Sequence, residues 1–216
     1  MPIVKNYDYQ TLPKWFAMKK YELLVLNKQG SCTIQNDYGK IAIALISGSC
    51  SLVDNGKKVM LKTGEHYFSD TQSLQASAGQ TPLSGECEGE CEMMVMYGDW
   101  QEAVLSMFTV EVSDSPENPG TKTNYYRNTV FENHYHDYDE CWIVYKGGGV
   151  ACNEGKLIEV RAGDCVVTGI GHHHDFPIVQ EKVYAIALEP EATGDKRIGH
   201  LWEHTHGPAV PRADRV

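Results

Sequence analysis

The chain carries, at residues 134–147, the stretch HYHDYDECWIVYKG, in which ligand-type side chains precede an apolar run of strand length. Alternate residues of an extended strand point to the same face. We therefore expect His134, His136 and Glu140 on one face, with Trp142 continuing it. Two imidazoles and a carboxylate gathered on one face predict a site for a divalent metal ion.

A further ligand is expected later in the chain. After a predicted turn at Gly163 and a short apolar segment comes the run GIGHHH, residues 169–174. Its last residue, His174, would add a third imidazole to the site from a second strand. His172 has the same parity as His174, so it is a candidate acid or base in the same pocket.

The same pattern is written twice along the chain. Glycines stand at 48, 56 and 64 and again at 147, 155 and 163, so the members of each pair are 99 residues apart (147−48, 155−56, 163−64). Asn55-Gly56 is typical of a type I′ turn between two strands, because both central residues of that turn take positive φ. The repeat predicts an all-β chain of two small barrels, residues 1–104 and 105–216, joined near residues 98–107.

These residues resemble the two sequence motifs of the cupin superfamily. The first, G-x5-H-x-H-x3-E-x6-G, is matched at His134, His136, Glu140 and Gly147, and the second, G-x5-P-x-G-x2-H-x3-N, at Gly163, Gly171 and His174. Three turn or border positions depart from the motifs, which concerns loop shape rather than metal binding: Asn128, Gly169 and Ile178. The resemblance implies two cupin-type barrels (double-stranded β-helix, or jelly roll) in tandem. It also implies one divalent ion, Fe, Mn, Ni or Zn, held by the four ligands.

The first copy lacks the ligands of the second. Subtracting 99 from the four ligand positions gives Gln35, Asp37, Ile41 and Gln75. Isoleucine cannot bind a metal, and amide groups are poor ligands for a transition metal. The first barrel is therefore expected to hold no metal and to serve a structural purpose.

Residues around the first motif predict a pocket for a small-molecule substrate. Glu132 shares the parity of the ligands, so it joins His172 as a catalytic candidate that could move a proton. Arg127 and Tyr125 lie on the segment entering the motif and could bind a substrate carboxylate or hydroxyl, with Trp142 as a further substrate contact. This mixture of aromatic and polar groups fits a sugar or a hydroxy or keto acid.

The four ligands alone do not select the reaction, because cupins with this set include several enzyme classes. The first hypothesis is a metal-dependent isomerase, epimerase or lyase acting on a small oxygenated metabolite. A mononuclear non-haem iron dioxygenase is the first alternative, and a non-catalytic cupin that binds a small ligand is the second.

Composition and charge restrict the partners. The formal net charge of −10 disfavours nucleic acid and anionic membranes, because both are themselves negative. Residues 1–5, MPIVK, lack the pattern of a signal peptide, and the seven cysteines are then expected to be reduced thiols in a cytoplasmic protein. Since cupins commonly pair through their sheets, the resemblance also implies a homodimer.

The end of the chain contains HLWEH at residues 200–204, which formally matches the H-x-x-E-H pattern of inverzincin proteases. That site needs a longer helix and a further acidic ligand. No glutamate follows His204, and Gly207-Pro208 ends any helix, so the protease is rejected. A tail that folds back over the mouth of a barrel is the alternative.

Overall fold

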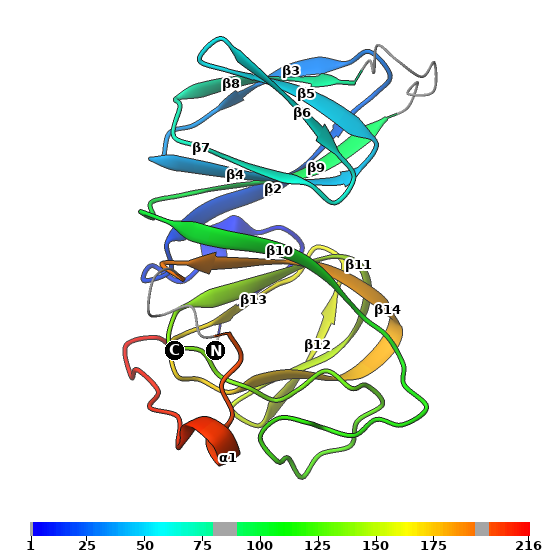
Figure 1. Cartoon of the computed structure of the whole chain (residues 1–216), viewed down its shortest axis with the longest axis vertical. Helices are drawn as coiled ribbons and strands as arrows, with labels where there is room; N and C mark the ends of the chain where they lie inside the picture. The colour runs from blue at the N-terminus through cyan, green and yellow to red at the C-terminus, as the bar shows by residue number, and fades with distance from the viewer. Residues whose placement is uncertain (1, 80–89, 193–198) are drawn as a thin grey trace. The chain divides into compact units, whose positions relative to one another are not determined.

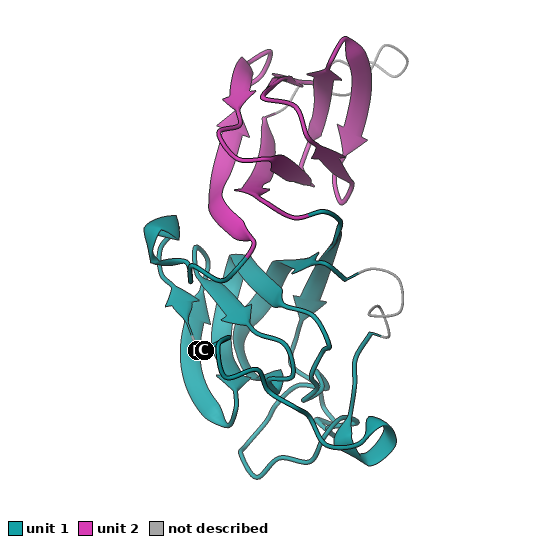
Figure 2. Cartoon of the chain, turned by 90° about the vertical axis from the view of Figure 1, so that its left-hand side faces the viewer, with its two compact units in different colours: residues 1–16, 101–216 teal, residues 17–100 magenta. Residues whose placement is uncertain are grey.

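The computed structural model describes residues 2–79, 90–192 and 199–216. Nearly all regular structure there is antiparallel β-strand, which confirms the predicted fold class. The chain forms two compact units, one made of Met1–Phe16 with Gln101–Val216 and the other of Ala17–Trp100 (Figure 2). No helix in the described ranges is long and apolar enough to span a membrane. Cys87, one of the predicted free thiols, lies outside the described residues.

The two units divide the chain differently from the predicted domains at its N-terminal end. The join lies between Trp100 and Gln101, within the range of residues 98–107 expected from the sequence and four residues before the boundary given as 104. The first sixteen residues belong with the second barrel, because strand β1 (Ile3–Val4) pairs with β13 (Cys165–Thr168) and the Tyr7 amide donates to the carbonyl of Gly163 at 2.7 Å. No local pattern predicts such a contact across more than 150 residues of chain.

The unit of residues 17–100 consists of two four-stranded sheets (Figure 1). Apolar side chains from both sheets form its core. The strand orders are β2-β9-β4-β7 and β3-β8-β5-β6. The bounds are β2 Met18–Leu26, β3 Ser31–Gln35, β4 Lys40–Ser47, β5 Ser49–Asp54, β6 Lys57–Lys62, β7 His66–Ser69, β8 Ser73–Ala78 and β9 Cys91–Gly98. Ile41, at a position equivalent to a ligand, is fully buried in the apolar core. Gln75 instead lies near the surface and donates to the hydroxyl of Thr33 at 2.8 Å.

The other unit has a sheet with the order β1-β13-β11-β14-β10, and β12 pairs with β11. The bounds are β10 Ala103–Val110, β11 Glu140–Asn153, β12 Lys156–Arg161, β13 Cys165–Thr168 and β14 His174–Pro190, with the short helices η1 Tyr9–Thr11 and α1 Glu203–His206. The pairing of β11 with β14 is interrupted by several register shifts. Such bulges let long strands bend and close around a core, which here contains Trp142 and Phe176.

The glycine repeat is visible in the backbone of both units. Asn55 and Gly56 have φ of 48° and 80°, and Glu154 and Gly155 have φ of 48° and 72°. These residues turn β5 into β6 and β11 into β12, so the predicted type I′ hairpin is confirmed and occurs in both copies. Gly147, with φ of 76°, has a second reason to be glycine, because an ideal Cβ there would lie 2.0 Å from the carbonyl oxygen of Lys182.

Candidate metal centre

From strand parity we expected the ligands of the first motif on one regular strand. They do not share one. His134 pairs with His174 in an isolated antiparallel bridge, and Tyr135 pairs with Leu201 in another. The backbone then bends before β11 begins at Glu140. This bend brings the carboxylate of Glu140 to the two imidazoles, so the residues converge although the strand is interrupted.

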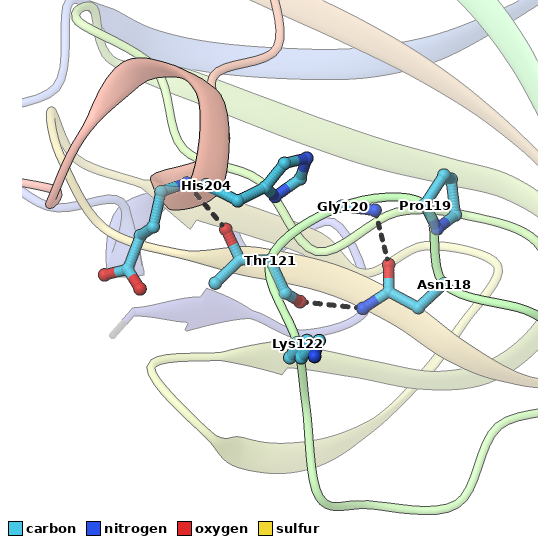
Figure 3. Close-up of a pocket in the computed structure, with 7 residues that line it drawn as sticks. Asn118, Pro119, Gly120, Thr121, Lys122 and His204 are labelled. Atoms are coloured by element: carbon cyan, nitrogen blue, oxygen red, sulfur yellow. Dashed lines mark hydrogen bonds between the residues drawn. The ribbon is translucent and has the colours of Figure 1, made fainter.

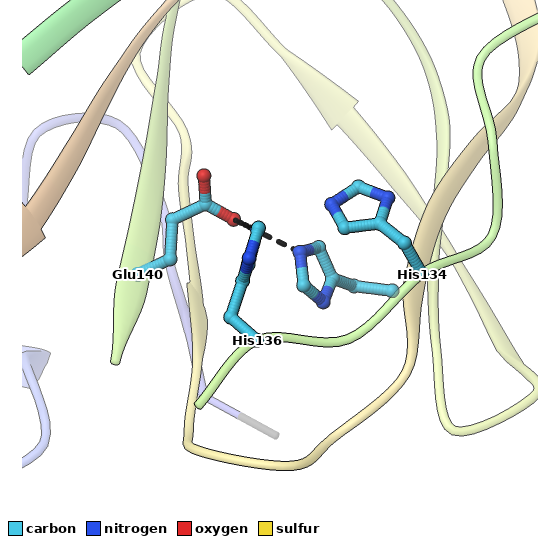
Figure 4. A group of neighbouring side chains, drawn as sticks. His134, His136 and Glu140 are labelled. Atoms are coloured by element: carbon cyan, nitrogen blue, oxygen red, sulfur yellow. Dashed lines mark ion pairs between the residues drawn. The ribbon is translucent and has the colours of Figure 1, made fainter. Parts of the chain in front are cut away.

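The four predicted ligands form one buried cluster. Their potential ligand atoms all lie within 4.8 Å of one another. Nε2 of His174 lies 2.9 Å from Oε2 of Glu140, and Nε2 of His136 lies 3.6 Å from the same oxygen. Figure 4 shows His134, His136 and Glu140 pointing toward one another.

Each imidazole of the cluster is oriented by a backbone carbonyl at its Nδ1 atom. His134 bonds to the carbonyl of Glu132 at 2.8 Å, His136 to that of Gly199 at 2.9 Å, and His174 to that of His172 at 3.0 Å. A carbonyl can only accept, so each Nδ1 carries a hydrogen, and in a neutral ring the lone pair is then at Nε2. This is how histidine ligands of metal sites are commonly held.

The described residues offer the facing atoms no hydrogen-bond partner. Nε2 of His134, His136 and His174 and Oε2 of Glu140 are buried and make no hydrogen bond among the described residues. A buried polar atom without a partner costs about 1–3 kcal/mol. Four such atoms aimed at one point are difficult to explain unless a cation binds there, and three imidazole nitrogens with one carboxylate oxygen fit a divalent transition metal.

The electrostatics of the cluster also suit a cation. Burial lowers the pKa of His136 to about 4, although Glu140 opposes the shift, and burial lowers the pKa of His134 well below its usual value. Burial alone would raise the pKa of Glu140, but the neighbouring side chains of His136, His174 and Trp142 bring it to about 2. At neutral pH the carboxylate is therefore ionised, and the rings of His134 and His136 keep their lone pairs.

The two predicted catalytic residues have different surroundings. His172 does not reach the cluster, because the Gly169 carbonyl accepts its amide hydrogen in a turn and strand parity does not apply there. Its Nε2 lies 3.1 Å from the carbonyl oxygen of Arg212, and its Nδ1 lies 3.6 Å from Glu154. Glu132 is close to the cluster, where its carboxylate pairs with Nδ1 of His200.

The predicted substrate contacts also separate into two groups. Arg127 and Tyr125 both donate to Oδ2 of Asp175, at 2.5 and 2.8 Å, and Arg127 also donates to the carbonyl of Phe131. Their polar groups are therefore engaged within the protein rather than aimed at the cluster. Trp142 is buried in the barrel, with its ring centroid 5.1 Å from that of His174.

The hollows on this unit include one beside the cluster and one beside the tail. One of about 350 Å³ is lined by Val110, Phe131, Glu132 and His200 among others. It adjoins the cluster, because the rings of both Phe131 and His200 contact His134. The other, of about 680 Å³, lies where residues 118–122 meet the tail at Glu203 and His204 (Figure 3).

Two residues at the cluster were not predicted to belong to it. Gly199 supplies the carbonyl that orients His136, and His200 stacks on His134 with 3.7 Å between ring centroids and 11° between planes. In the sequence, His200 stands out only within the rejected H-x-x-E-H pattern. Neither residue has a spacing relative to the ligands that would reveal the contact.

Comparison with known proteins agrees with this geometry. The family described as the cupin domain matches residues 124–188. The uncharacterized protein y4oW of Sinorhizobium fredii (strain NBRC 101917 / NGR234) is 34% identical over 207 residues, which cover 94% of this chain and 92% of the relative.

Solved structures with similar folds have much lower sequence identity. A Bacillus subtilis oxalate decarboxylase studied for its Mn(II) centres has a TM-score of 0.58 and 10% identity, covering 89% of this chain and 73% of its own. Vicilin from Corylus avellana (hazelnut) has a TM-score of 0.56 and 8% identity, covering 89% and 80%. At such identities the likeness is one of fold alone.

Proposed function

This chain belongs to the cupin superfamily, and on that premise we propose that its C-terminal barrel is a metal-dependent enzyme acting on a small oxygenated metabolite. The proposed reaction is of the isomerase, epimerase or lyase type. The observation that carries the proposal is the set of four buried ligand atoms that face one another without a hydrogen bond to any described residue. In this proposal His134, His136, Glu140 and His174 hold one divalent ion.

The surroundings of the cluster support a small substrate. The hollow of about 350 Å³ beside His134 is near the lower end of the usual range for ligand pockets. Val110 and Phe131 line this hollow with apolar side chains, and Glu132 and His200 line it with polar groups. The chemistry that a bound divalent ion supplies is Lewis-acid polarisation of a substrate carbonyl or hydroxyl oxygen.

Glu132 is the proposed group for moving a proton, and His172 is not proposed again. The carboxylate of Glu132 lies at the rim with one partner, His200, and belongs to the second group of potential ligands around His134. A carboxylate in that position could accept a proton from a substrate held in the adjacent hollow. The ring of His172, in contrast, is engaged with the Arg212 carbonyl.

Metal content is the first test of the proposal. We expect about one divalent ion per chain, with Mn(II) examined first because the oxalate decarboxylase of similar fold has Mn(II) centres. His136→Ala and His174→Ala should each weaken binding at least about hundredfold, the upper end of what even an outer-shell change costs. Elemental analysis of untagged protein measures this, with His204→Ala as a control on an exposed histidine.

The outcomes separate the alternatives. Turnover of a sugar or hydroxy-acid panel without oxygen, using Mn(II)- or Zn(II)-loaded protein, would support the isomerase or lyase. Bound iron together with oxygen consumption would favour the non-haem iron dioxygenase instead. A folded wild type that takes up no metal on reloading would contradict the proposal.

A further inference from the structure

We propose that the C-terminal tail, residues 199–215, positions the ligands of the metal centre. In this inference the tail sets the orientation of His134 and His136, and it joins the two segments that carry the ligands. The inference rests on the proposed function, because it concerns the affinity of the same site. Gly199 and His200 are positioning residues in it, since they act on the metal through other side chains.

The first contact of the tail is with the imidazole of His136. His134 and His174 are oriented by carbonyls two residues earlier in their own segments. His136 takes its acceptor from Gly199, 63 residues away in sequence, at 2.9 Å. The orientation of this ligand therefore depends on where the tail lies, whereas that of the other two is set locally.

The second contact is made by the next residue. The ring of His200 lies parallel to that of His134, with centroids 3.7 Å apart. The carboxylate of Glu132 holds Nδ1 of His200, while the carbonyl of Glu132 holds Nδ1 of His134. One residue thus fixes both stacked rings, and His200 covers one face of the ligand.

Backbone pairing fixes this part of the tail onto the ligand segment. Tyr135, between the two histidine ligands, donates its amide to Leu201 at 3.1 Å and accepts the amide of Leu201 at 3.0 Å. Its hydroxyl donates to the carbonyl of Gly207 at 2.9 Å. Helix α1 begins beside the loop of residues 118–122, where the Glu203 amide donates to the hydroxyl of Thr121 at 3.2 Å (Figure 3).

The rest of the tail holds the second ligand segment. The Arg212 amide donates to the carbonyl of Ile170 at 3.1 Å, and the Arg212 carbonyl lies 3.1 Å from Nε2 of His172. Arg215 lies 3.3 Å from Asp139, whose carboxylate also accepts the amide of Ile170 at 3.0 Å. The tail therefore contacts the segment that ends at Glu140 and the segment that ends at His174.

Gly199→Ala tests the first contact. Gly199 has φ of 90°, and an added Cβ would meet no described atom within 4 Å, so the substitution changes backbone preference without a clash. A changed backbone would turn the carbonyl away from His136. We expect binding of Co(II), used alone as the probe, to weaken about tenfold, with a changed Co(II) absorption spectrum.

Gly64→Ala is the matched control. Its φ is 87°, close to that of Gly199, and its Cβ would also meet no described atom within 4 Å. We expect its Co(II) affinity to stay within about twofold of wild type, since Gly64 lies in the other unit, between β6 and β7. Equal weakening in both variants, or none in Gly199→Ala, would overturn the assignment to Gly199.

Two substitutions of His200 test the second contact. His200→Ala removes the stacked ring, and we expect Co(II) binding to weaken roughly fivefold, about the worth of one aromatic pair. His200→Phe keeps a flat ring without nitrogen and should restore most of the affinity. Co(II) affinity unchanged in His200→Ala, or equally weak in His200→Phe, would contradict positioning by stacking.

The proposed function and this inference fail in different ways. If wild type binds no Co(II), or binds it equally well in His136→Ala, the metal centre itself is wrong. If wild type binds Co(II) through His136 and the variants of Gly199 and His200 match it, only the role of the tail is wrong. Thermal unfolding of each metal-free variant checks that the barrel has folded.

Discussion

Arg127→Met is expected to lower the free energy of unfolding by about 3–5 kcal/mol, the usual cost of removing one partner from a buried ion pair. The guanidinium of Arg127 lies 2.5 Å from Oδ2 of Asp175, and the two side chains are 9% and 0% exposed. Burial raises the pKa of Asp175 even though Tyr125 and Arg127 oppose the shift. Without the arginine, a carboxylate beside His174 would be buried with no opposing charge.

Urea unfolding followed by tryptophan fluorescence measures the loss, because three of the four tryptophans lie in this unit: Trp15, Trp142 and Trp202. The double variant Arg127→Met/Asp175→Asn is the control. It removes both charges and leaves an amide oxygen for Tyr125, so most of the stability should return.

The same experiment decides between two roles for Arg127. A residue that binds substrate would leave stability nearly unchanged and weaken turnover when replaced. A stability loss that the double variant repairs would instead assign Arg127 to the scaffold behind His174. Unchanged stability in Arg127→Met would contradict the structural role.

The ligand set could be predicted from sequence because it is encoded by short spacings. His134, His136 and Glu140 lie within seven residues, and His174 follows a glycine-rich turn of recognisable pattern. Strand parity predicted the right residues although the strand is not regular, since a bend separates the histidines from β11. Local geometry differed from expectation, but the number of residues between ligands still brought them together.

Contacts between distant segments could not be predicted in this way. The pairing of Arg127 with Asp175, the turn that directs His172 away from the cluster, and the docking of the tail all depend on tertiary structure. An arginine before a histidine motif looks the same in sequence whether it faces a substrate or a buried aspartate. Charge and parity restrict the choices, and only the fold distinguishes them.

The two units also show which parts of the repeat serve the fold. Their glycines at equivalent positions share positive φ, whereas the ligand positions differ completely between them. The barrel of residues 17–100 fills its interior with apolar side chains where the other gathers imidazoles. The glycines therefore belong to the architecture common to both copies, and the ligands to the function of one.

Gly147→Ala follows from this distinction and is expected to cost about 2–5 kcal/mol of stability. The residue has φ of 76°, a conformation that costs a residue with a Cβ about 1–2 kcal/mol. The Cβ would also lie 2.0 Å from the carbonyl oxygen of Lys182 on β14, so backbone must move. Forcing extra volume into a packed site typically costs a further 1–3 kcal/mol or so. The midpoint of urea unfolding of this unit measures the sum.

Gly155→Ala separates the two contributions. Its φ is 72°, close to that of Gly147, but its Cβ would meet nothing within 4 Å. It should therefore lose only about 1–2 kcal/mol, the conformational part alone. If Gly147→Ala loses no more stability than Gly155→Ala, the backbone of β14 can shift to accommodate the added methyl group. The glycine shared by the two copies would then be explained by backbone conformation rather than by close approach of the strands.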